Sequence, residues 1–138
     1  MLYLDASVVL RRVLGEPHPL RELDQPTDWT TSLLTEVECL RSLDRLYQLG
    51  RLDADEVART RAVVFDVLSA SRVMPVDPAI LRRASDPLPT PVGTLDAIHL
   101  VTALAIVGEW PDEPVTFATH DRELSRAARA CGLDVIGA

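Results

Sequence analysis

Four acidic side chains from separate parts of the chain are candidates for shared chemistry. Asp5 ends a short apolar run, Asp121 follows another apolar run closely, and Asp96 lies at the start of a predicted helix. A fourth acid comes from the helix after the second predicted strand, where Glu36 and Glu38 both qualify. Clustered carboxylates repel one another by roughly 1–4 kcal/mol per pair. Such a cluster is therefore stable only with bound protons or cations.

An acidic cluster of this kind predicts a metal site. Sites built only from oxygen ligands favour hard divalent cations, so Mg²⁺ or Mn²⁺ is expected rather than zinc. Mg²⁺ keeps several waters and takes further ligands from substrate phosphates. The chemistry that follows is hydrolysis of a phosphodiester bond by a metal-activated water. Both one-metal and two-metal arrangements are compatible with the residues.

The elements that would position these acids alternate between strands and helices. Strands are predicted at 2–4, 29–32, 73–76, 115–119 and 133–136, and helices at 6–14, 33–49, 53–69, 78–84, 94–107 and 122–130. This alternation predicts an α/β fold in three layers, α/β/α, with a mostly parallel central sheet of about five strands. Sites in such sheets form at the carboxyl ends of strands, which gives the acids a common location.

Local signals support several of these helices. Asp53 with Glu56 is typical of a capping box, and Thr94 is the predicted N-cap of helix 94–107. Apolar residues recur at three- and four-residue steps along helix 33–49, namely Leu33, Val37, Leu40 and Tyr47.

The composition is that of an ordinary globular protein, with 138 residues, 47% of them hydrophobic and 25% charged. This length suits a single domain over residues 1–138. The longest apolar stretch, 100–107, is too short to cross a bilayer, and the N-terminus is not typical of a signal peptide. Cys39 and Cys131 lack paired spacing, which indicates reduced core thiols. We therefore expect a cytoplasmic protein with no membrane partner.

The net charge and the types of basic residue exclude several classes of function. A net charge of −7 excludes global attraction as the source of nucleic-acid binding, whereas two bound Mg²⁺ ions would reduce it to −3. All fourteen basic residues are Arg, which argues against phosphoacceptor signalling domains that need a Lys. An Asp-nucleophile phosphatase would have a second acid where Ser7 stands, and a nucleotide-binding domain would have a glycine-rich first loop.

Four segments, spread over nearly the whole chain, resemble the PIN-domain family. Residues 5–7 (DAS) follow a Leu-Tyr-Leu strand like the family's opening motif, and residues 31–41 (TSLLTEVECLR) resemble its strand end and glutamate-bearing helix. Residues 95–100 (LDAIHL) are the most specific match, and residues 119–124 (THDREL) resemble the closing motif. The compact length is similar to that of VapC-type toxins.

The resemblance implies a Mg²⁺- or Mn²⁺-dependent endoribonuclease that is the toxin of a type II toxin–antitoxin pair. The family's catalytic and metal-binding acids match Asp5, Glu38, Asp96 and Asp121, and its supporting hydroxyls match Ser7 and Thr119. The resemblance also implies an RNA substrate, a cognate small antitoxin and a homodimer. The alternative is a catalytically inactive PIN-like module that acts through protein contacts, and the full set of acids argues against it.

Several side chains have two possible roles. Helical periodicity places Glu36 nearer the buried side, whereas the resemblance points to Glu38, which we follow. His99 stands three residues after Asp96, and a hydrogen-bonded structural role is favoured over metal ligation. Three others are compatible with either RNA contact or ordinary pairing: His120, Arg41 and Arg45.

Overall fold

The structure, a computed structural model, describes residues 1–24 and 28–138. In this part of the chain the centre is a five-stranded sheet of β1 (Leu2–Leu4), β2 (Trp29–Ser32), β3 (Arg72–Met74), β4 (Thr116–Ala118) and β5 (Asp134–Ile136). The strand order is β3-β2-β1-β4-β5, and every pairing is parallel. The predicted parallel sheet of about five strands is therefore confirmed.

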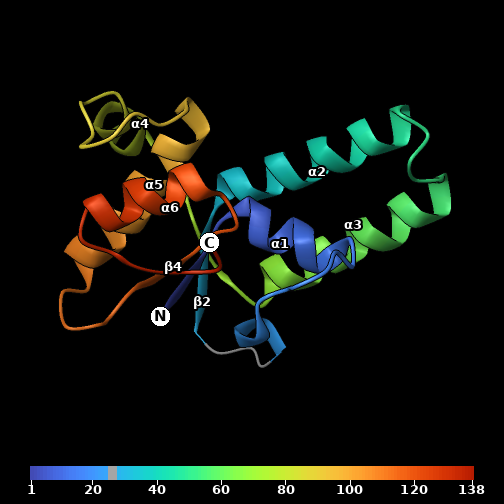
Figure 1. Ribbon diagram of the computed structural model, residues 1–138, viewed down its shortest axis with the longest axis horizontal. Coiled ribbons are helices and arrows are strands. Elements are labelled where there is room, and N and C mark those ends of the chain that lie inside the picture. The colour runs from blue at the N-terminus through green and yellow to red at the C-terminus, as the bar shows by residue number, and fades with distance from the viewer. Residues whose placement is uncertain (25–27) are drawn as a thin grey trace.

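Helices cover the sheet in two groups. They are α1 (Ala6–Val13), α2 (Leu33–Gln48), α3 (Ala54–Ser69), α4 (Pro78–Ala84), α5 (Thr94–Glu109) and α6 (Arg122–Ala130), with a short 3₁₀ helix η1 (Arg21–Asp24). In Figure 1, α1, α2 and α3 lie on one side of the strands, and α4, α5 and α6 on the other. Right-handed crossovers explain this, because the chain crosses from β1 to β3 in one direction and returns through β4 to β5 in the other. The α/β/α layering is confirmed.

The element boundaries differ from the predicted ones in a few places. β3 ends at Met74 rather than Val76, because Pro75 has no N–H to donate to the ladder. The N-cap of α5 is Gly93, and the predicted cap Thr94 is already helical. The helix η1 was not predicted. The capping box of α3 is confirmed, since Asp53 and Glu56 each accept the other's backbone N–H.

Strand alternation divides the buried apolar side chains between the two faces. Leu2 and Leu4 point into the first core, which also holds Val8, Val9, Leu23, Trp29, Cys39, Leu43, Val64, Val67, Leu68, Ala6 and Ala118. Tyr3 points the other way into the second core, with Leu100, Ala103, Ile106, Val115, Phe117, Leu124, Ala127, Ala128 and Leu133. Cys39 is a core thiol as predicted, but Cys131 is only half-buried, because it lies just past the end of α6.

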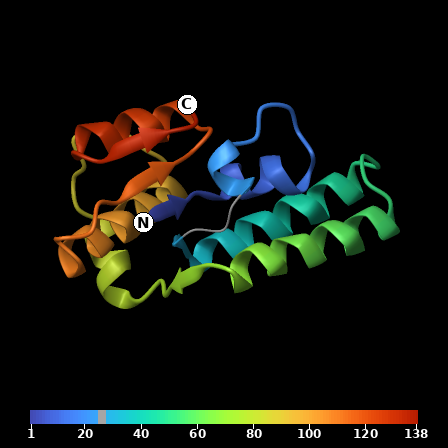
Figure 2. The ribbon, with the colours of Figure 1, turned by 90° about the horizontal axis from the view of Figure 1, so that it is seen from below.

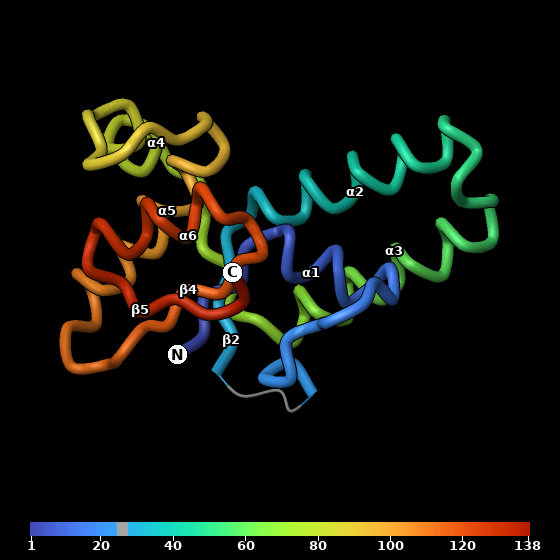
Figure 3. Tube along the Cα trace, in the orientation of Figure 1, coloured from blue at the N-terminus to red at the C-terminus, as the bar shows by residue number. Residues whose placement is uncertain are grey.

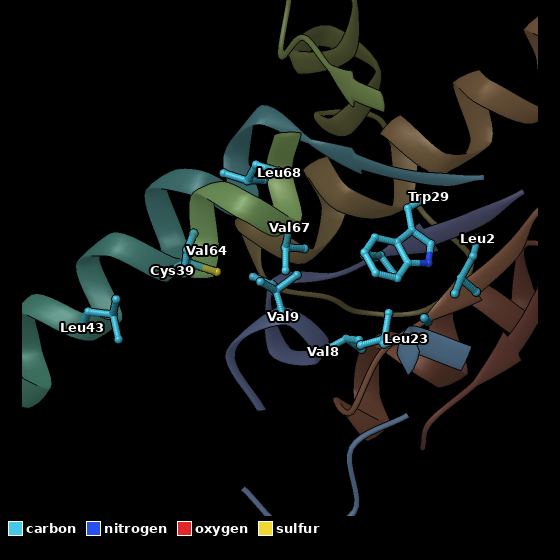
Figure 4. Packing of buried hydrophobic residues seen from close by; sticks show 13 residues of the cluster. Leu2, Val8, Val9, Leu23, Trp29, Cys39, Leu43, Val64, Val67 and Leu68 are labelled. Atoms are coloured by element: carbon cyan, nitrogen blue, oxygen red, sulfur yellow. The ribbon is translucent and has the colours of Figure 1, made fainter. Parts of the chain in front are cut away.

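Helices α2 and α3 form an antiparallel pair that extends away from the sheet (Figures 2 and 3). The first core continues between them, where Cys39 and Leu43 of α2 lie near Val64 of α3 (Figure 4). The predicted helix is confirmed, but of the four apolar residues that predicted it only Leu40 packs against the first core. Leu33, Val37 and Tyr47 are 46%, 55% and 51% exposed.

A hydrogen bond joins the start of α2 to β2. The Thr35 hydroxyl, at the start of the helix, lies 2.7 Å from the hydroxyl of Thr31 in β2, and both residues are fully buried. The inward face of the helix runs from Thr35 through Cys39 to Leu43. None of the described helices is both long and apolar enough to span a bilayer.

Candidate functional site

The strand order creates a switch point at β1. β1 pairs with β2 on one side and with β4 on the other, so the connections leaving β1 and β4 run to opposite faces of the sheet. Such points in open parallel sheets hold binding sites at the carboxyl ends of the strands. Asp5 follows β1 directly, and Thr119 follows β4 with Asp121 two residues later.

Asp5 is almost fully buried and its orientation is fixed. Its Oδ2 accepts hydrogen bonds from the Ser7 hydroxyl at 2.5 Å, the Ser7 N–H at 3.3 Å and the Thr119 hydroxyl at 2.9 Å. Its Oδ1 lies 3.6 Å from Nε2 of His99. The protein therefore holds one oxygen of the carboxylate firmly and leaves the other available.

The two hydroxyls also link β1 to the loop before α6. The Ser7 hydroxyl accepts the His120 N–H at 3.0 Å, and the Thr119 hydroxyl accepts the Asp121 N–H at 3.0 Å. Each hydroxyl thus donates to Asp5 and accepts from the β4–α6 loop. The structure places both predicted supporting hydroxyls on the first acid.

Asp121 is exposed and caps α6. Its Oδ1 accepts the backbone N–H groups of Glu123 at 2.7 Å and Leu124 at 2.9 Å. Asp5 caps α1 in the same way. The capping role that these residue types favour is therefore real at both positions. It occupies one oxygen of each carboxylate.

Asp96, in the first turn of α5, lies within electrostatic range of the other three acids. Burial raises the pKa of Asp96, and the charges of Asp121, Asp5 and Glu38 raise it further, while a hydrogen bond from the Gly93 backbone opposes them. His99, three residues later in α5, lies beside both Glu38 and Asp5, so the start of α5 lies at the same edge of the sheet as the other predicted acids. Gly93 fits closely beneath Asp96, because a Cβ there would lie 3.2 Å from the Asp96 Oδ2.

Glu38 reaches the same edge from α2. Its Oε2 lies 2.6 Å from Nε2 of His99, while the other ring nitrogen, Nδ1, lies 2.9 Å from the hydroxyl of Tyr3. Glu36 makes no side-chain hydrogen bond or ion pair to any residue that the structure describes. Of the two candidates, Glu38 is the one beside the other acids.

The sequence left RNA contact or pairing within the protein open for Arg41, His120 and Arg45. Arg41 is exposed and pairs with Asp44 at 2.9 Å. His120 donates from Nδ1 to the carbonyl of Gly137 at 2.8 Å. Arg45 makes no ion pair among residues 1–24 and 28–138.

Sequence reasoning did not single out Tyr3 or Gly93. Tyr3 carries the only hydroxyl in a Leu-Tyr-Leu strand, and a buried hydroxyl needs a partner, which was a usable signal. Gly93 had no such signal, because its importance comes from the tertiary position of Asp96.

The donor set suits a hard divalent cation. Asp5, Glu38 and Asp121 each have one oxygen held by a protein donor and one oxygen without a hydrogen bond from the described residues. Oxygen-only sets of this kind match Mg²⁺ or Mn²⁺. In the arrangement described for residues 1–24 and 28–138, no three Asp, Glu, His or Cys side chains stand close enough together to hold one ion.

Comparison with known proteins relates the chain to one family. The family model described as PIN domain matches residues 2–130. Ribonuclease VapC35 of Mycobacterium tuberculosis is 32% identical over 142 residues, covering 99% of this chain and 96% of that protein. Ribonuclease VapC46 of the same species is 30% identical, covering 98% and 95%.

Solved structures share the fold. FitAcB from Neisseria gonorrhoeae matches with a TM-score of 0.70 at 19% identity, covering 99% of this chain and 96% of that one. PAE2754 from Pyrobaculum aerophilum matches with a TM-score of 0.66 at 20% identity, covering 99% and 83%.

Proposed function

Because this chain belongs to the PIN-domain family and has VapC-type relatives, we propose that it is a Mg²⁺- or Mn²⁺-dependent endoribonuclease, the toxin of a toxin–antitoxin pair. The observation that carries the proposal is the convergence of acids. His99 of α5 lies 2.6 Å from Glu38 and 3.6 Å from Asp5. Burial raises the pKa of Asp96, one turn earlier in α5, and the charges of Asp121, Asp5 and Glu38 raise it further. Helix capping and surface exposure alone do not require acids from separate elements to lie at one edge of a sheet.

Asp5, Glu38, Asp96 and Asp121 would hold the metal. When bound, the ion supplies an activated water and stabilises the leaving oxygen of the scissile phosphodiester. Ser7 and Thr119 keep the Asp5 carboxylate in one orientation by donating to its Oδ2. The backbone N–H groups of α6 hold Asp121 in the same manner.

Charge explains why a cation belongs in this mechanism. Like charges keep the carboxylates apart, and an RNA phosphate would be repelled by the same acids. The net charge of −7 adds to this repulsion. A cation among the carboxylates provides the local attraction that a phosphate needs.

The two glutamates of α2 provide a matched test. Glu38→Gln should reduce Mg²⁺-dependent RNA cleavage by on the order of 10–100-fold or more, because it removes a ligand charge while keeping the side chain's size. Glu36→Gln should change cleavage little. Circular dichroism on both variants separates chemistry from unfolding. The opposite ranking would move the ligand to Glu36.

A metal titration separates an enzyme from an inactive interaction module. Binding to the native state raises stability by about 2.7 kcal/mol at a hundredfold excess of metal over the dissociation constant. Thermal unfolding should therefore shift upward with Mn²⁺ or Mg²⁺ in the native protein and much less in Asp96→Asn. A module without use for metal would show no shift.

The proposed partner is a small antitoxin that covers this edge. A group of carboxylates attracts Arg or Lys, and Arg binds a carboxylate through two hydrogen bonds. Exposed apolar side chains flank the acids in sequence, Leu33 and Val37 on α2 and Leu95 on α5, and would supply apolar contact area. We expect the purified complex to survive moderate salt, and its structure to show a basic partner residue at the acids. A complex in which neither the partner nor a metal ion contacts the four acids would contradict this.

The toxin itself is proposed to be a homodimer. Light scattering on the isolated protein tests this directly, since one chain has a mass of 15.2 kDa. A monomer at micromolar concentration would contradict the proposal without affecting the assignment of the site.

A further inference from the structure

We infer that His99 is a positioning residue that holds Glu38 at the acidic site, and that Tyr3 fixes the ring of His99 for this task. The inference rests on the proposed function, in which Glu38 is a ligand. It assigns a task to two buried residues that the metal site does not otherwise explain.

The hydrogen bonds around His99 determine which nitrogen carries the proton. Nε2 faces two carboxylates, with Glu38 Oε2 at 2.6 Å and Asp5 Oδ1 at 3.6 Å. A bare nitrogen lone pair would be repelled there, so Nε2 carries the hydrogen and donates it to Glu38. In the neutral ring Nδ1 is then an acceptor, and the Tyr3 hydroxyl at 2.9 Å is its donor.

Tyr3 is itself rigidly placed. Tyr3 is fully buried and His99 is 1% exposed. The Tyr3 ring is stacked on Phe117 with centroids 5.0 Å apart and an interplanar angle of 17°. A chain of donors thus runs from the Tyr3 hydroxyl through the imidazole to the Glu38 carboxylate, which lies at the partly exposed end.

Glu38 needs this support more than Asp5 does. Its side chain is longer and 22% exposed, and His99 provides its one hydrogen bond or ion pair within the described residues. Asp5, by contrast, is held by two hydroxyls and a backbone N–H. Hydrogen-bonded partners that orient a ligating carboxylate typically change metal affinity 10–100-fold when they are removed.

The same contacts argue against His99 as a metal ligand. Both ring nitrogens are engaged, one as a donor to Glu38 and the other as an acceptor from Tyr3. Neither therefore has a free lone pair directed at the acids. His99 acts through Glu38.

The experiment combines metal affinity with ring chemistry. Mn²⁺ binding is measured by electron paramagnetic resonance for the native protein, His99→Phe, His99→Gln and Tyr3→Phe, with the exposed His18→Gln as the control. His99→Phe should weaken Mn²⁺ binding 10–100-fold. His99→Gln should recover most of that loss, because its amide NH₂ can donate to Glu38. Tyr3→Phe should give a smaller loss, and the control none.

A second readout does not depend on metal. Nitrogen-15 spectra of the metal-free native protein should show one His99 tautomer, with the hydrogen on Nε2, and Tyr3→Phe should shift the Nδ1 resonance. A hydrogen on Nδ1 would overturn the inference. It would also be overturned if His99→Phe folds and the native protein, His99→Gln and His99→Phe all bind Mn²⁺ with the same affinity. If His99→Phe does not fold, Tyr3→Phe decides, because unchanged affinity and an unchanged Nδ1 resonance would overturn the inference. Absence of Mn²⁺ binding by the native protein would refute the proposed function instead. The nitrogen-15 spectra would then still test the hydrogen bond between Tyr3 and His99.

Discussion

Asp96 is the acid whose charge the surrounding protein opposes. Burial raises its pKa, and so do the charges of Asp121, Asp5 and Glu38. A carboxylate whose pKa is higher in the folded state than in the unfolded state destabilises the fold wherever it is ionised. Metal-free protein at neutral pH therefore carries unfavourable charge energy at this residue.

Asp96→Asn should remove RNA cleavage and leave the metal-free protein slightly more stable at pH 7. The gain is expected to be below about 1 kcal/mol, because Asp96 is partly exposed and solvent screens it. The gain should begin to fall as pH drops through the raised pKa of Asp96, and it should be gone below the lower pKa of the unfolded state, where the carboxyl is neutral in both states. Thermal unfolding of both proteins between pH 3 and pH 8 measures this. A variant that cleaves RNA at the native rate would refute the role of Asp96.

Cys39 provides an independent check on the buried side of α2. Burial and the nearby charges of Glu38 and Asp5 raise the pKa of Cys39 to about 12. The thiolate, which is the reactive form, is therefore scarce at pH 8. We expect an aromatic disulfide reagent to modify the half-buried Cys131 in native protein and to reach Cys39 only after unfolding. Rapid modification of Cys39 would contradict the described packing.

At the scale of elements, the start of α5 is shaped to receive Asp96. Gly93 caps the helix with an ordinary φ of −66°, so an alanine is sterically allowed by the backbone. Its Cβ would nevertheless lie 3.2 Å from the Asp96 carboxylate. Glycine at this position therefore leaves space for the Asp96 carboxylate and is not required by the backbone conformation.

Gly93→Ala should displace Asp96 by a few tenths of an ångström and lower Mn²⁺ affinity, while stability changes by less than about 1 kcal/mol. Gly108, near the other end of α5, is the matched control because a Cβ there meets nothing within 4 Å. Gly108→Ala should raise stability by roughly 0.5–1 kcal/mol and leave metal affinity unchanged. Equal metal affinity in both variants would show that Gly93 has no such role.

Helix α2 shows which features of an element can be predicted from the sequence and which cannot. Helix α2 was predictable from its apolar periodicity, but the buried face was not, because Leu33, Val37 and Tyr47 form an alternative stripe. The buried face instead runs through Thr35, Cys39 and Leu43, and Thr35 contacts Thr31 of β2, a contact that only the folded sheet creates. Periodicity favoured Glu36 because Glu36 lies close to the arc of Leu40 and Leu43. That arc does pack against the first core, yet the structure places Glu38 beside His99.

The site was predictable to the extent that it depends on sequence order. Asp5 and Asp121 follow strands whose carboxyl ends must share an edge in a parallel sheet, so their proximity follows from topology. The Tyr3–His99–Glu38 chain depends on side chains that are 96 and 61 residues apart. No local pattern encodes such distances.

At the scale of the whole molecule, binding of RNA to a chain of net charge −7 should require the cation. With an RNA that resists cleavage, we expect little binding in the presence of a chelator and clear binding with Mg²⁺, measured by fluorescence anisotropy at one fixed salt concentration. Asp96→Asn separates local from global charge, because its net charge is −6. RNA binding by Asp96→Asn should increase only weakly with Mg²⁺, although this variant is less negative than the native protein. Tight binding without any divalent cation would contradict the proposal.

The use of one carboxylate for both a helix cap and the site has a consequence for genetic selection. In a mutational scan that scores cellular abundance and toxicity separately, alanine at Asp5 or Asp121 should lower both scores, because losing an N-cap costs about 0.5–2 kcal/mol. Alanine at Asp96, whose helix is capped by Gly93, should lower toxicity alone. Spontaneous escape from toxicity would then leave two kinds of survivor, one in which the protein disappears and one in which an inert protein persists.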